Sequence, residues 1–242
     1  MNTLKHIFAL LSCACAASVC SAASVRITFD NPIYNGSGFD NVSIRYPGGS
    51  SDVAASRFQG TASNIVGVPS SIFVDGPKDV YMYCYDLYHD ISGGQVVNYI
   101  INFNGVLSRT LDFLGAVNGV MNLGNATADP YAWLHPVNGA QGAAIQLGIW
   151  ESKYENSGWN LDTGSFKASG LEAATTTYWN SFKNAIDTYG DLDAHFVMTF
   201  ESTSAQSMIA GDPPVSVPEP GSLALLGAGL AGLAFARRNK VS

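Results

Sequence analysis

The residues of this chain that could do chemistry together are a cysteine and a glutamine. Cys84 lies in the aromatic stretch YMYCYDLYHD (81–90), and Gln146 lies in the apolar stretch AAIQLGIWE (143–151). A cysteine sulfur can attack the carboxamide carbon of a glutamine side chain and release ammonia, which leaves an internal thioester. Such a stored electrophile requires an unpaired cysteine, a glutamine at close range and an apolar shell that excludes water.

The start of the chain decides whether Cys84 is unpaired. Lys5, the apolar run from Ile7 to Val19 and the small residues that follow have the three-part plan of a secretory signal peptide over residues 1–23. A membrane anchor would need a longer apolar run. Cleavage of this segment removes three of the four cysteines, Cys13, Cys15 and Cys20. The single thiol that remains cannot form an internal disulfide in an oxidising compartment.

Four side chains near the pair could shield a thioester from water. Tyr83 and Tyr85 flank the cysteine, while Ile149 and Trp150 follow the glutamine at about one helical turn. A buried glutamine amide needs hydrogen-bond partners, so its position requires an explanation. The alternative interpretation is that the cysteine is a small buried hydrophobe and that the amide of Gln146 hydrogen-bonds to the sheet.

The elements that must position these residues change character along the chain. Residues 24–106 contain short β-rich runs separated by Gly, Pro, Asn and Asp clusters, which predicts an antiparallel sandwich or barrel. The predicted strands are VRITF (25–29), NVSIRY (41–46), SIFV (71–74), DVYMYCYDLY (79–88) and VVNYIINF (96–103), with AHFVMTF (194–200) later in the chain.

The second half of the chain predicts helices. They cover residues 109–121, 139–155 and 169–189, and Ser169 with Glu172 forms a possible capping box for the last. We therefore expect a mainly β fold of the α+β class with a helical subdomain over residues 24–201. Residues 202–217 are rich in Ser, Pro and Gly and are predicted to be a linker.

The end of the chain, residues 218–242, has its own signature. The sequence Pro218-Glu219-Pro220 precedes fifteen apolar or small residues, 222–236, which as a helix would be about 22 Å long. That is short of a bilayer core. The basic residues Arg237, Arg238 and Lys240 follow as a membrane stop. This segment predicts a short C-terminal transmembrane helix.

This end resembles the PEP-CTERM sorting signal of Gram-negative bacteria. The resemblance implies export through the secretion machinery across the inner membrane, transient anchoring in the membrane and processing by an exosortase. It further implies a final place at the cell surface or in the extracellular matrix, with a role in exopolysaccharide or biofilm.

The sequences YCYDLY and IQLGIWE together resemble the thioester domain of bacterial surface adhesins. In that family a cysteine follows an aromatic residue, and a glutamine lies in a motif Thr-Gln-x-Ala-Ile-Trp. The resemblance implies that Cys84 is the thioester cysteine and Gln146 its acyl partner, and that the protein attaches covalently to surface amines. Two positions depart from the motif: Ile145 stands where Thr is usual, and Gly148 where Ala is usual.

Composition narrows the remaining classes of function. The formal net charge is −7, and four of the 12 basic residues lie in the two end segments, so the body repels nucleic acid. No cofactor or metal is expected: Asp86, His89 and Asp90 are a candidate metal cluster, but His and Asp at a strand end are more often solvated. An enzyme is not expected either, because a thioester is consumed in one turnover.

The alternatives are a non-covalent polysaccharide-binding or structural matrix protein and, remotely, a cysteine hydrolase that uses a histidine as base. The histidines considered for that role are His89, His135 and His195.

Overall fold

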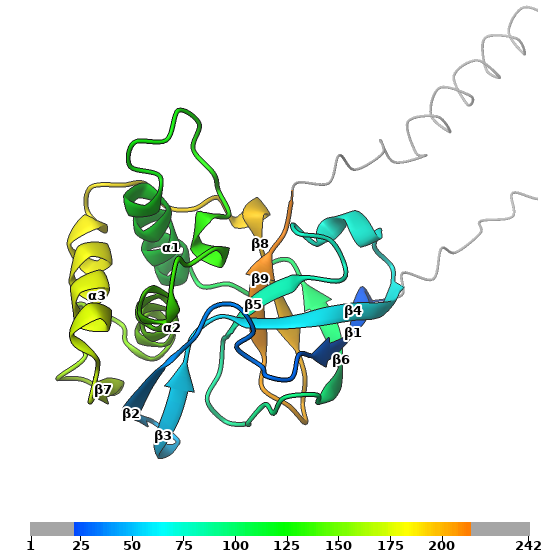
Figure 1. The fold of residues 1–242 in the computed structure, drawn as a ribbon, viewed down its shortest axis with the longest axis horizontal. Helices are drawn as coiled ribbons and strands as arrows, with labels where there is room; N and C mark the ends of the chain where they lie inside the picture. Colours follow the sequence, from blue (N-terminus) through cyan, green and yellow to red (C-terminus); the bar gives the residue numbers. More distant parts are fainter. Residues whose placement is uncertain (1–21, 214–242) are drawn as a thin grey trace, which may run out of the picture.

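The structure, a computed structural model, describes residues 22–213, and one part of it is a closed antiparallel β-barrel. Six strands form the barrel, in the order β1-β4-β5-β9-β8-β6. Their bounds are β1 Ser24–Phe29, β4 Phe58–Val66, β5 Val80–Cys84, β9 Met208–Gly211, β8 Val197–Glu201 and β6 Val96–Asn102. Closure leaves no exposed sheet edge. Both ends of the described chain lie on the barrel (Figure 1).

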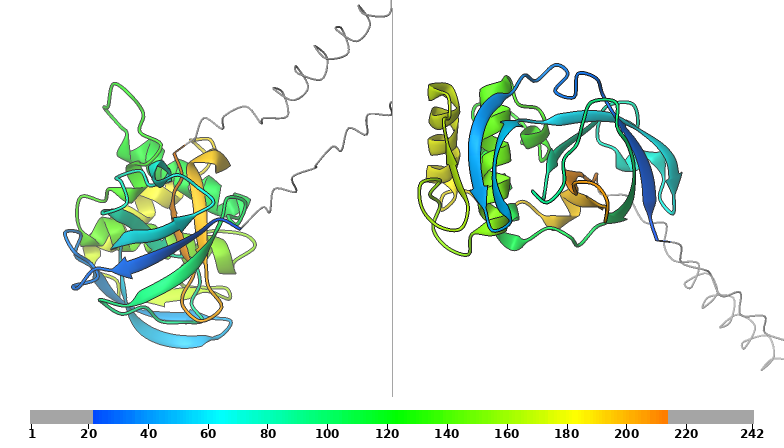
Figure 2. Two further views of the ribbon diagram at one scale, coloured as in Figure 1. Left: turned by 90° about the vertical axis from the view of Figure 1, so that its right-hand side faces the viewer. Right: turned by 90° about the horizontal axis from the view of Figure 1, so that it is seen from below.

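The other part of the molecule combines a three-stranded sheet with three helices. The sheet has the order β3-β2-β7, with bounds β3 Gly49–Ala55, β2 Asp40–Tyr46 and β7 Lys167–Ser169. The helices are α1 Ser108–Met121, α2 Gly139–Tyr154 and α3 Ala173–Ala185. Figure 1 and the right view of Figure 2 show α3 as the outermost layer, with α2 between it and the barrel.

Hydrophobic patterning explains why these elements form. In β2 and β6, buried and exposed residues alternate, as expected for strands with one face on the core. In α2 the residues from Gln141 to Ser152 are all buried, because α1, α3, the small sheet and β5 surround this helix. α2 is therefore the element that joins the helices to the barrel.

The expected antiparallel barrel accompanied by helices is confirmed for residues 22–213, but the fold mixes a six-stranded barrel with three helices and is not mainly β. Three local predictions were wrong. Residues 71–74 form no strand, because a 3-10 turn (Ser70–Ile72) lies there. The strand predicted over 79–88 ends at Cys84. Ser169 lies in β7, and Glu172 caps α3 without a side-chain hydrogen bond, so there is no capping box.

The predicted linker contains part of the barrel. Residues 208–211 form β9, whose four residues are all buried, and β9 closes the barrel between β5 and β8. A strand of four residues that are all buried shows no alternation of apolar and polar residues, so the sequence does not reveal it. The exported domain therefore extends at least to Gly211.

The two predicted targeting segments fall almost entirely outside the described residues. The signal peptide (1–23) and the sorting segment (218–242) with its predicted transmembrane helix are not described, apart from residues 22 and 23. Between residues 22 and 213, no helix combines the length and the apolar character needed to cross a membrane.

Candidate functional site

Cys84 is the last residue of β5, and only 2% of its surface is exposed. On one side β5 pairs with β9, and the amide of Tyr85 donates to the carbonyl of Ser207 at 2.8 Å. Successive residues of a strand direct their backbone groups to opposite sides, so the backbone of Cys84 faces β4. β4 begins at Phe58, opposite Met82, and therefore leaves Cys84 without a strand partner on that side.

Gln146 of α2 supplies the missing backbone partner. The amide of Cys84 donates to Oε1 of Gln146 at 2.9 Å, and Nε2 of Gln146 donates to the carbonyl of Cys84 at 2.8 Å. The glutamine is fully buried, and its carboxamide takes the place of a strand residue. The two predicted residues do meet, but they meet through the backbone of Cys84. This contact fits the alternative interpretation of Gln146, an amide bonded to the sheet.

A different glutamine contacts the sulfur. Sγ of Cys84 lies 2.9 Å from Oε1 of Gln206, a residue between β8 and β9 that is 6% exposed. This separation is the usual one for an N–H···O bond, about 2.9 Å, although sulfur is the larger atom. The carboxamide carbon of Gln206 is one bond beyond that oxygen. The acyl role expected for Gln146 therefore fits Gln206 better on geometry.

Two hydrogen bonds hold Gln206 in place, and two further contacts hold the residues that follow it. The Tyr99 hydroxyl donates to the carbonyl of Gln206 at 2.9 Å, and Nε2 of Gln206 donates to the carbonyl of Asp86 at 2.6 Å. The carboxylate of Asp86 accepts the amide of Ser207 at 2.8 Å, and Met208 pairs with Cys84. Asp86 thus serves this turn as an acceptor, which is a different role from the metal ligand considered above.

The four predicted shielding residues are all at most 2% exposed, and each has contacts of its own. The hydroxyl of Tyr83 donates to the carbonyl of Trp133 at 3.1 Å, and the two rings stack. Tyr85 accepts the amide of Leu107 at 2.9 Å through its hydroxyl. The Trp150 ring packs 6.2 Å from that of Phe166, centroid to centroid. Tyr83, Tyr85, Ile149 and Trp150 are thus rigid parts of the core, and their shielding of a thioester stays a prediction.

The environment of the sulfur favours a neutral thiol. Burial raises the pKa of the Cys84 thiol well above its ordinary value, and the carboxylates of Asp86 and Asp90 raise it further. At neutral pH the sulfur therefore carries its proton and can donate it to Oε1 of Gln206. A thiolate nucleophile of the kind used by cysteine hydrolases requires the opposite shift.

The histidines do not assemble a base beside the cysteine. His135 and His195 each hydrogen-bond to an aspartate, and His89 is exposed. Within residues 22–213, no hydrogen bond joins a histidine to Cys84, and no cluster of three or more His, Cys, Asp or Glu residues is placed to hold a metal ion.

Two glycines of α2 explain how the helix approaches its neighbours. A Cβ added to Gly142 would lie 2.4 Å from Oγ of Ser56, so this glycine permits the helix to approach Ser56 closely. A Cβ on Gly148 would lie 1.9 Å from the Phe113 ring. Phe113 is fully buried, so its ring leaves no room for a side chain at position 148.

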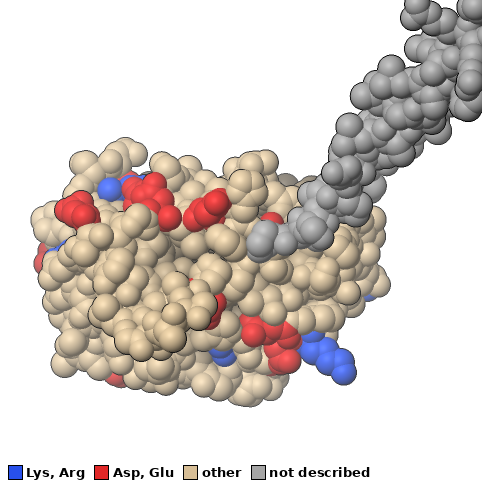
Figure 3. Space-filling model, turned by 90° about the horizontal axis from the view of Figure 1, so that it is seen from above, with Lys and Arg blue, Asp and Glu red and all other residues tan. Residues whose placement is uncertain are grey.

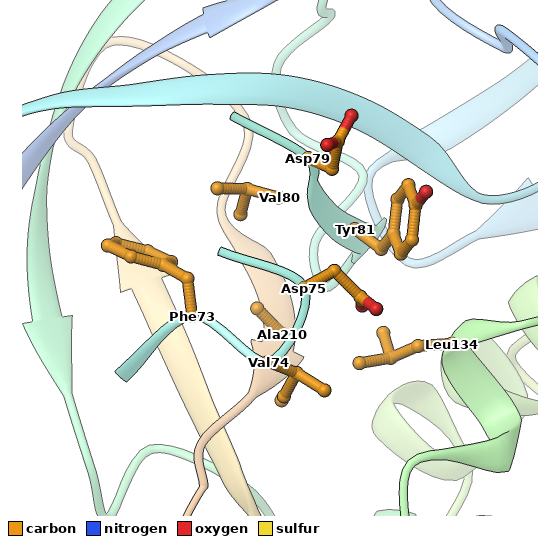
Figure 4. A pocket seen from close by; sticks show the side chains of 9 residues that line it. Phe73, Val74, Asp75, Asp79, Val80, Tyr81, Leu134 and Ala210 are labelled. Carbon is orange, nitrogen blue, oxygen red and sulfur yellow. The ribbon is translucent and has the colours of Figure 1, made fainter. Parts of the chain in front are cut away.

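The surface near the pair contains a groove. Its volume is about 500 Å³, and its lining includes Tyr85 and Ser207, the chain neighbours of Cys84 and Gln206. The hollow beside Asp75 in Figure 4 is much smaller, about 10 Å³, which is barely room for one water molecule. Basic side chains are few on the face in Figure 3. Neither hollow is lined by Cys84 or Gln206.

Sequence reasoning missed Gln206 because it lies in the stretch assigned to the linker. One sequence feature could have revealed it: the short apolar segment MIAG, typical of a buried strand, directly follows the polar segment SAQS (204–207). A glutamine two residues before a short apolar strand is a weak sign by itself. Only the pairing of β9 with β5 brings it to the cysteine.

Residues 216–238 match the family model of the PEP-CTERM protein-sorting motif. No curated protein and no solved structure matches the chain. The match covers the end of the chain and does not extend to the barrel or the helices.

Proposed function

We propose that this exported, exosortase-processed protein stores an internal thioester between Cys84 and Gln206 and uses it to attach itself covalently to amines at the cell surface or in the matrix. The observation that carries this proposal is the 2.9 Å contact between Sγ of Cys84 and Oε1 of Gln206, in a buried site. The sorting motif ties the protein to export and to the exopolysaccharide, where such attachment would be useful.

The reaction has two balanced steps. In the first, Sγ of Cys84 bonds to the carboxamide carbon of Gln206, and the thiol proton leaves with the amide nitrogen as ammonia. In the second, a primary amine bonds to the same carbon, and Cys84 leaves and recovers a proton from the amine. The product is an amide between Gln206 and the target. The site is consumed, so the protein acts once and is not a catalyst.

Gln146 has the role of a positioning residue in this proposal. Its two hydrogen bonds fix the backbone of Cys84 where no strand partner exists, which keeps the sulfur aimed at Gln206. Tyr99 and Asp86 fix the other partner. Pre-positioning of this kind favours an intramolecular attack, because the entropic cost of bringing the reacting groups together is already met by folding.

The intact mass of the exported protein tests this function. We expect the wild-type mass to be lower than the sequence mass by one ammonia, and methylamine to add once. Cys84→Ala and Gln206→Glu should show the full mass and no adduct. Gln206→Glu is the matched variant, since it keeps the size of the side chain but has no amide nitrogen to expel. A wild-type protein with full mass and a thiol that can be alkylated would contradict the proposal.

A second candidate function, non-covalent binding of polysaccharide, is favoured by a surface cluster of tyrosines. The rings of Tyr46, Tyr88 and Tyr154 contact one another with centroids 6.1–6.2 Å apart, and Tyr88 is 60% exposed. Exposed aromatic faces suit the apolar faces of sugar rings. Tyr88→Ala should weaken such binding and Cys84→Ala should leave it unchanged; sensitivity to Cys84→Ala alone would exclude it.

A further inference from the structure

We propose that the peptide bond between Asp212 and Pro213 cleaves itself under mildly acidic conditions, and that this step separates the exported domain from its sorting segment. The bond directly follows β9, the strand that closes the barrel. It precedes the match to the sorting motif, which begins at residue 216. The inference goes beyond the proposed function and does not depend on it, because the cleavage uses neither Cys84 nor Gln206.

The chemistry is an attack by an aspartate on its own main-chain carbonyl. An oxygen of the Asp212 carboxyl bonds to the carbonyl carbon of the same residue, which forms a small cyclic anhydride. The C–N bond to Pro213 breaks, and the carboxyl proton goes to the proline nitrogen. Proline favours this step because its nitrogen carries no N–H and leaves as a basic secondary amine. Water then opens the anhydride, which restores the side-chain carboxyl and leaves a new C-terminal carboxyl on Asp212.

The attacking carboxyl is buried and is not used by another contact. Asp212 is 7% exposed, and its Oδ1 accepts no hydrogen bond from any residue that the structure describes. A buried polar atom without a partner is costly and requires an explanation. Burial raises the pKa of Asp212 to about 6, while the nearby His195, itself bound to Asp193, opposes part of this rise. Near pH 5 most of the carboxyl therefore carries the proton that Pro213 needs.

The carbonyl under attack is polarised by a tyrosine. The hydroxyl of Tyr131 donates to the main-chain oxygen of Asp212 at 3.2 Å. Negative charge develops on this oxygen during the attack, and a fixed donor stabilises it. Burial and the carboxylates of Asp212 and Asp129 raise the pKa of Tyr131 to about 12, so the hydroxyl keeps its proton and remains a donor at neutral and acidic pH.

Further contacts hold both partners in register. The amide of Asp212 donates to the carbonyl of Phe196 at 3.0 Å, at the end of the 3-10 turn Ala194–Phe196. The rings of Phe196 and Tyr131 meet edge to face, with centroids 5.7 Å apart. Pro213 is half-buried, so water can reach the bond and open the anhydride. The fold thus combines a held carbonyl, a donor to its oxygen and an uncommitted carboxyl at one bond.

A second Asp-Pro bond in the chain, Asp129–Pro130, is an internal control. Asp129 is exposed, and its Oδ1 already accepts the amide of Tyr131 at 2.9 Å. Its carboxylate is solvated and hydrogen-bonded, so it lacks the buried, unpartnered state of Asp212. We expect cleavage at Asp212–Pro213 and none at Asp129–Pro130 under the same conditions.

Incubation of the exported protein with its sorting segment retained tests the inference. The protein is produced in a host without an exosortase, purified in detergent and kept with protease inhibitors at pH 5 and at pH 7. Intact mass reports a fragment that ends at Asp212. We expect a rate that is independent of protein concentration and about tenfold higher at pH 5, the ratio of protonated carboxyl for a pKa of about 6. Guanidinium should remove this cleavage, because an unfolded aspartate with a pKa of about 3.9 is mostly ionised at pH 5.

Three variants assign the roles. Asp212→Asn should stop the cleavage, and Pro213→Ala, which retains the carboxyl, should slow it strongly and tests the same bond if Asp212→Asn fails to fold. Tyr131→Phe keeps the ring but loses the donor, so the rate at pH 5 should fall by roughly tenfold to a hundredfold without a shift in the midpoint of the pH profile. An intact chain after incubation at pH 5, equal cleavage at both Asp-Pro bonds, or cleavage that persists in Asp212→Asn would each overturn the inference. None of these outcomes bears on the thioester, which the methylamine adduct tests separately.

Discussion

Sγ of Cys84 and Oε1 of Gln206 lie 2.9 Å apart although 122 positions separate the two residues in the chain. The contact exists because β9 pairs with β5 and closes the barrel, with Met208 opposite Cys84. Both side chains are buried, and this burial raises the pKa of the Cys84 thiol. A closed barrel is thereby also the scaffold of a candidate reactive pair.

Gln146 should stabilise the fold as well as the site. Gln146→Ala removes two hydrogen bonds and leaves the buried amide and carbonyl of Cys84 without partners. We expect the free energy of unfolding to fall by roughly 2–5 kcal/mol, measured by urea denaturation. Gln141→Ala on the same helix is the control, because that side chain accepts one hydrogen bond, from Val137, and its loss should cost less. Equal costs for the two variants would contradict this role.

The thiol of Cys84 should be unreactive at neutral pH when no thioester can form. In Gln206→Ala, alkylation by iodoacetamide depends on the thiolate, whose share rises with pH. Because burial and two carboxylates raise the pKa of Cys84, the midpoint of the pH–rate profile should lie above about 8.5, the ordinary cysteine value. A midpoint below that value would indicate a stabilised thiolate and would favour the cysteine hydrolase alternative.

Gly148 should not tolerate substitution by alanine. The added Cβ would meet the ring of Phe113, which packs against Trp159 and Trp179 and cannot move freely. Gly148→Ala should lower the free energy of unfolding by about 1–3 kcal/mol. Gly190→Ala is the matched control, because nothing lies within 4 Å of its new Cβ. A thermal shift for Gly148→Ala no larger than for Gly190→Ala would show that the helix repacks without cost.

The stability of the exported domain should fall as the pH rises toward neutral. Burial raises the pKa of Glu151 on α2 from about 4.5 to about 7, so the folded state binds a proton more tightly than the unfolded state. The stabilisation is complete below pH 4.5 and is lost as the pH rises through about 7. Glu151→Gln should flatten this part of the profile of unfolding free energy against pH. A wild-type slope that Glu151→Gln leaves unchanged would assign the effect to another group.

The sequence predicts an element well where its hydrophobic periodicity extends over many residues. It predicts poorly the short elements whose formation depends on tertiary strand pairing. The strands around residues 25–29 and 96–103 alternate clearly, and the helix over 139–155 was predicted within a residue of its observed end. The small-residue strands β3 and β9 carry little pattern, so β3 was not predicted and β9 was assigned to a linker. The pairing of Cys84 with Gln146 is predicted from residue type. The atoms that meet depend on two tertiary features: β4 begins opposite Met82 and so does not reach Cys84, and β9 closes the barrel.

The most direct test of the central claim is the position of the methylamine adduct. The exported protein is treated with methylamine and digested, and the modified peptide is sequenced by mass spectrometry. The account predicts a single methylated carboxamide at Gln206, with Gln146 unmodified and Cys84 recovered as a free thiol. An adduct at Gln146 would contradict the assignment of the acyl partner, and the absence of any adduct would contradict the thioester itself.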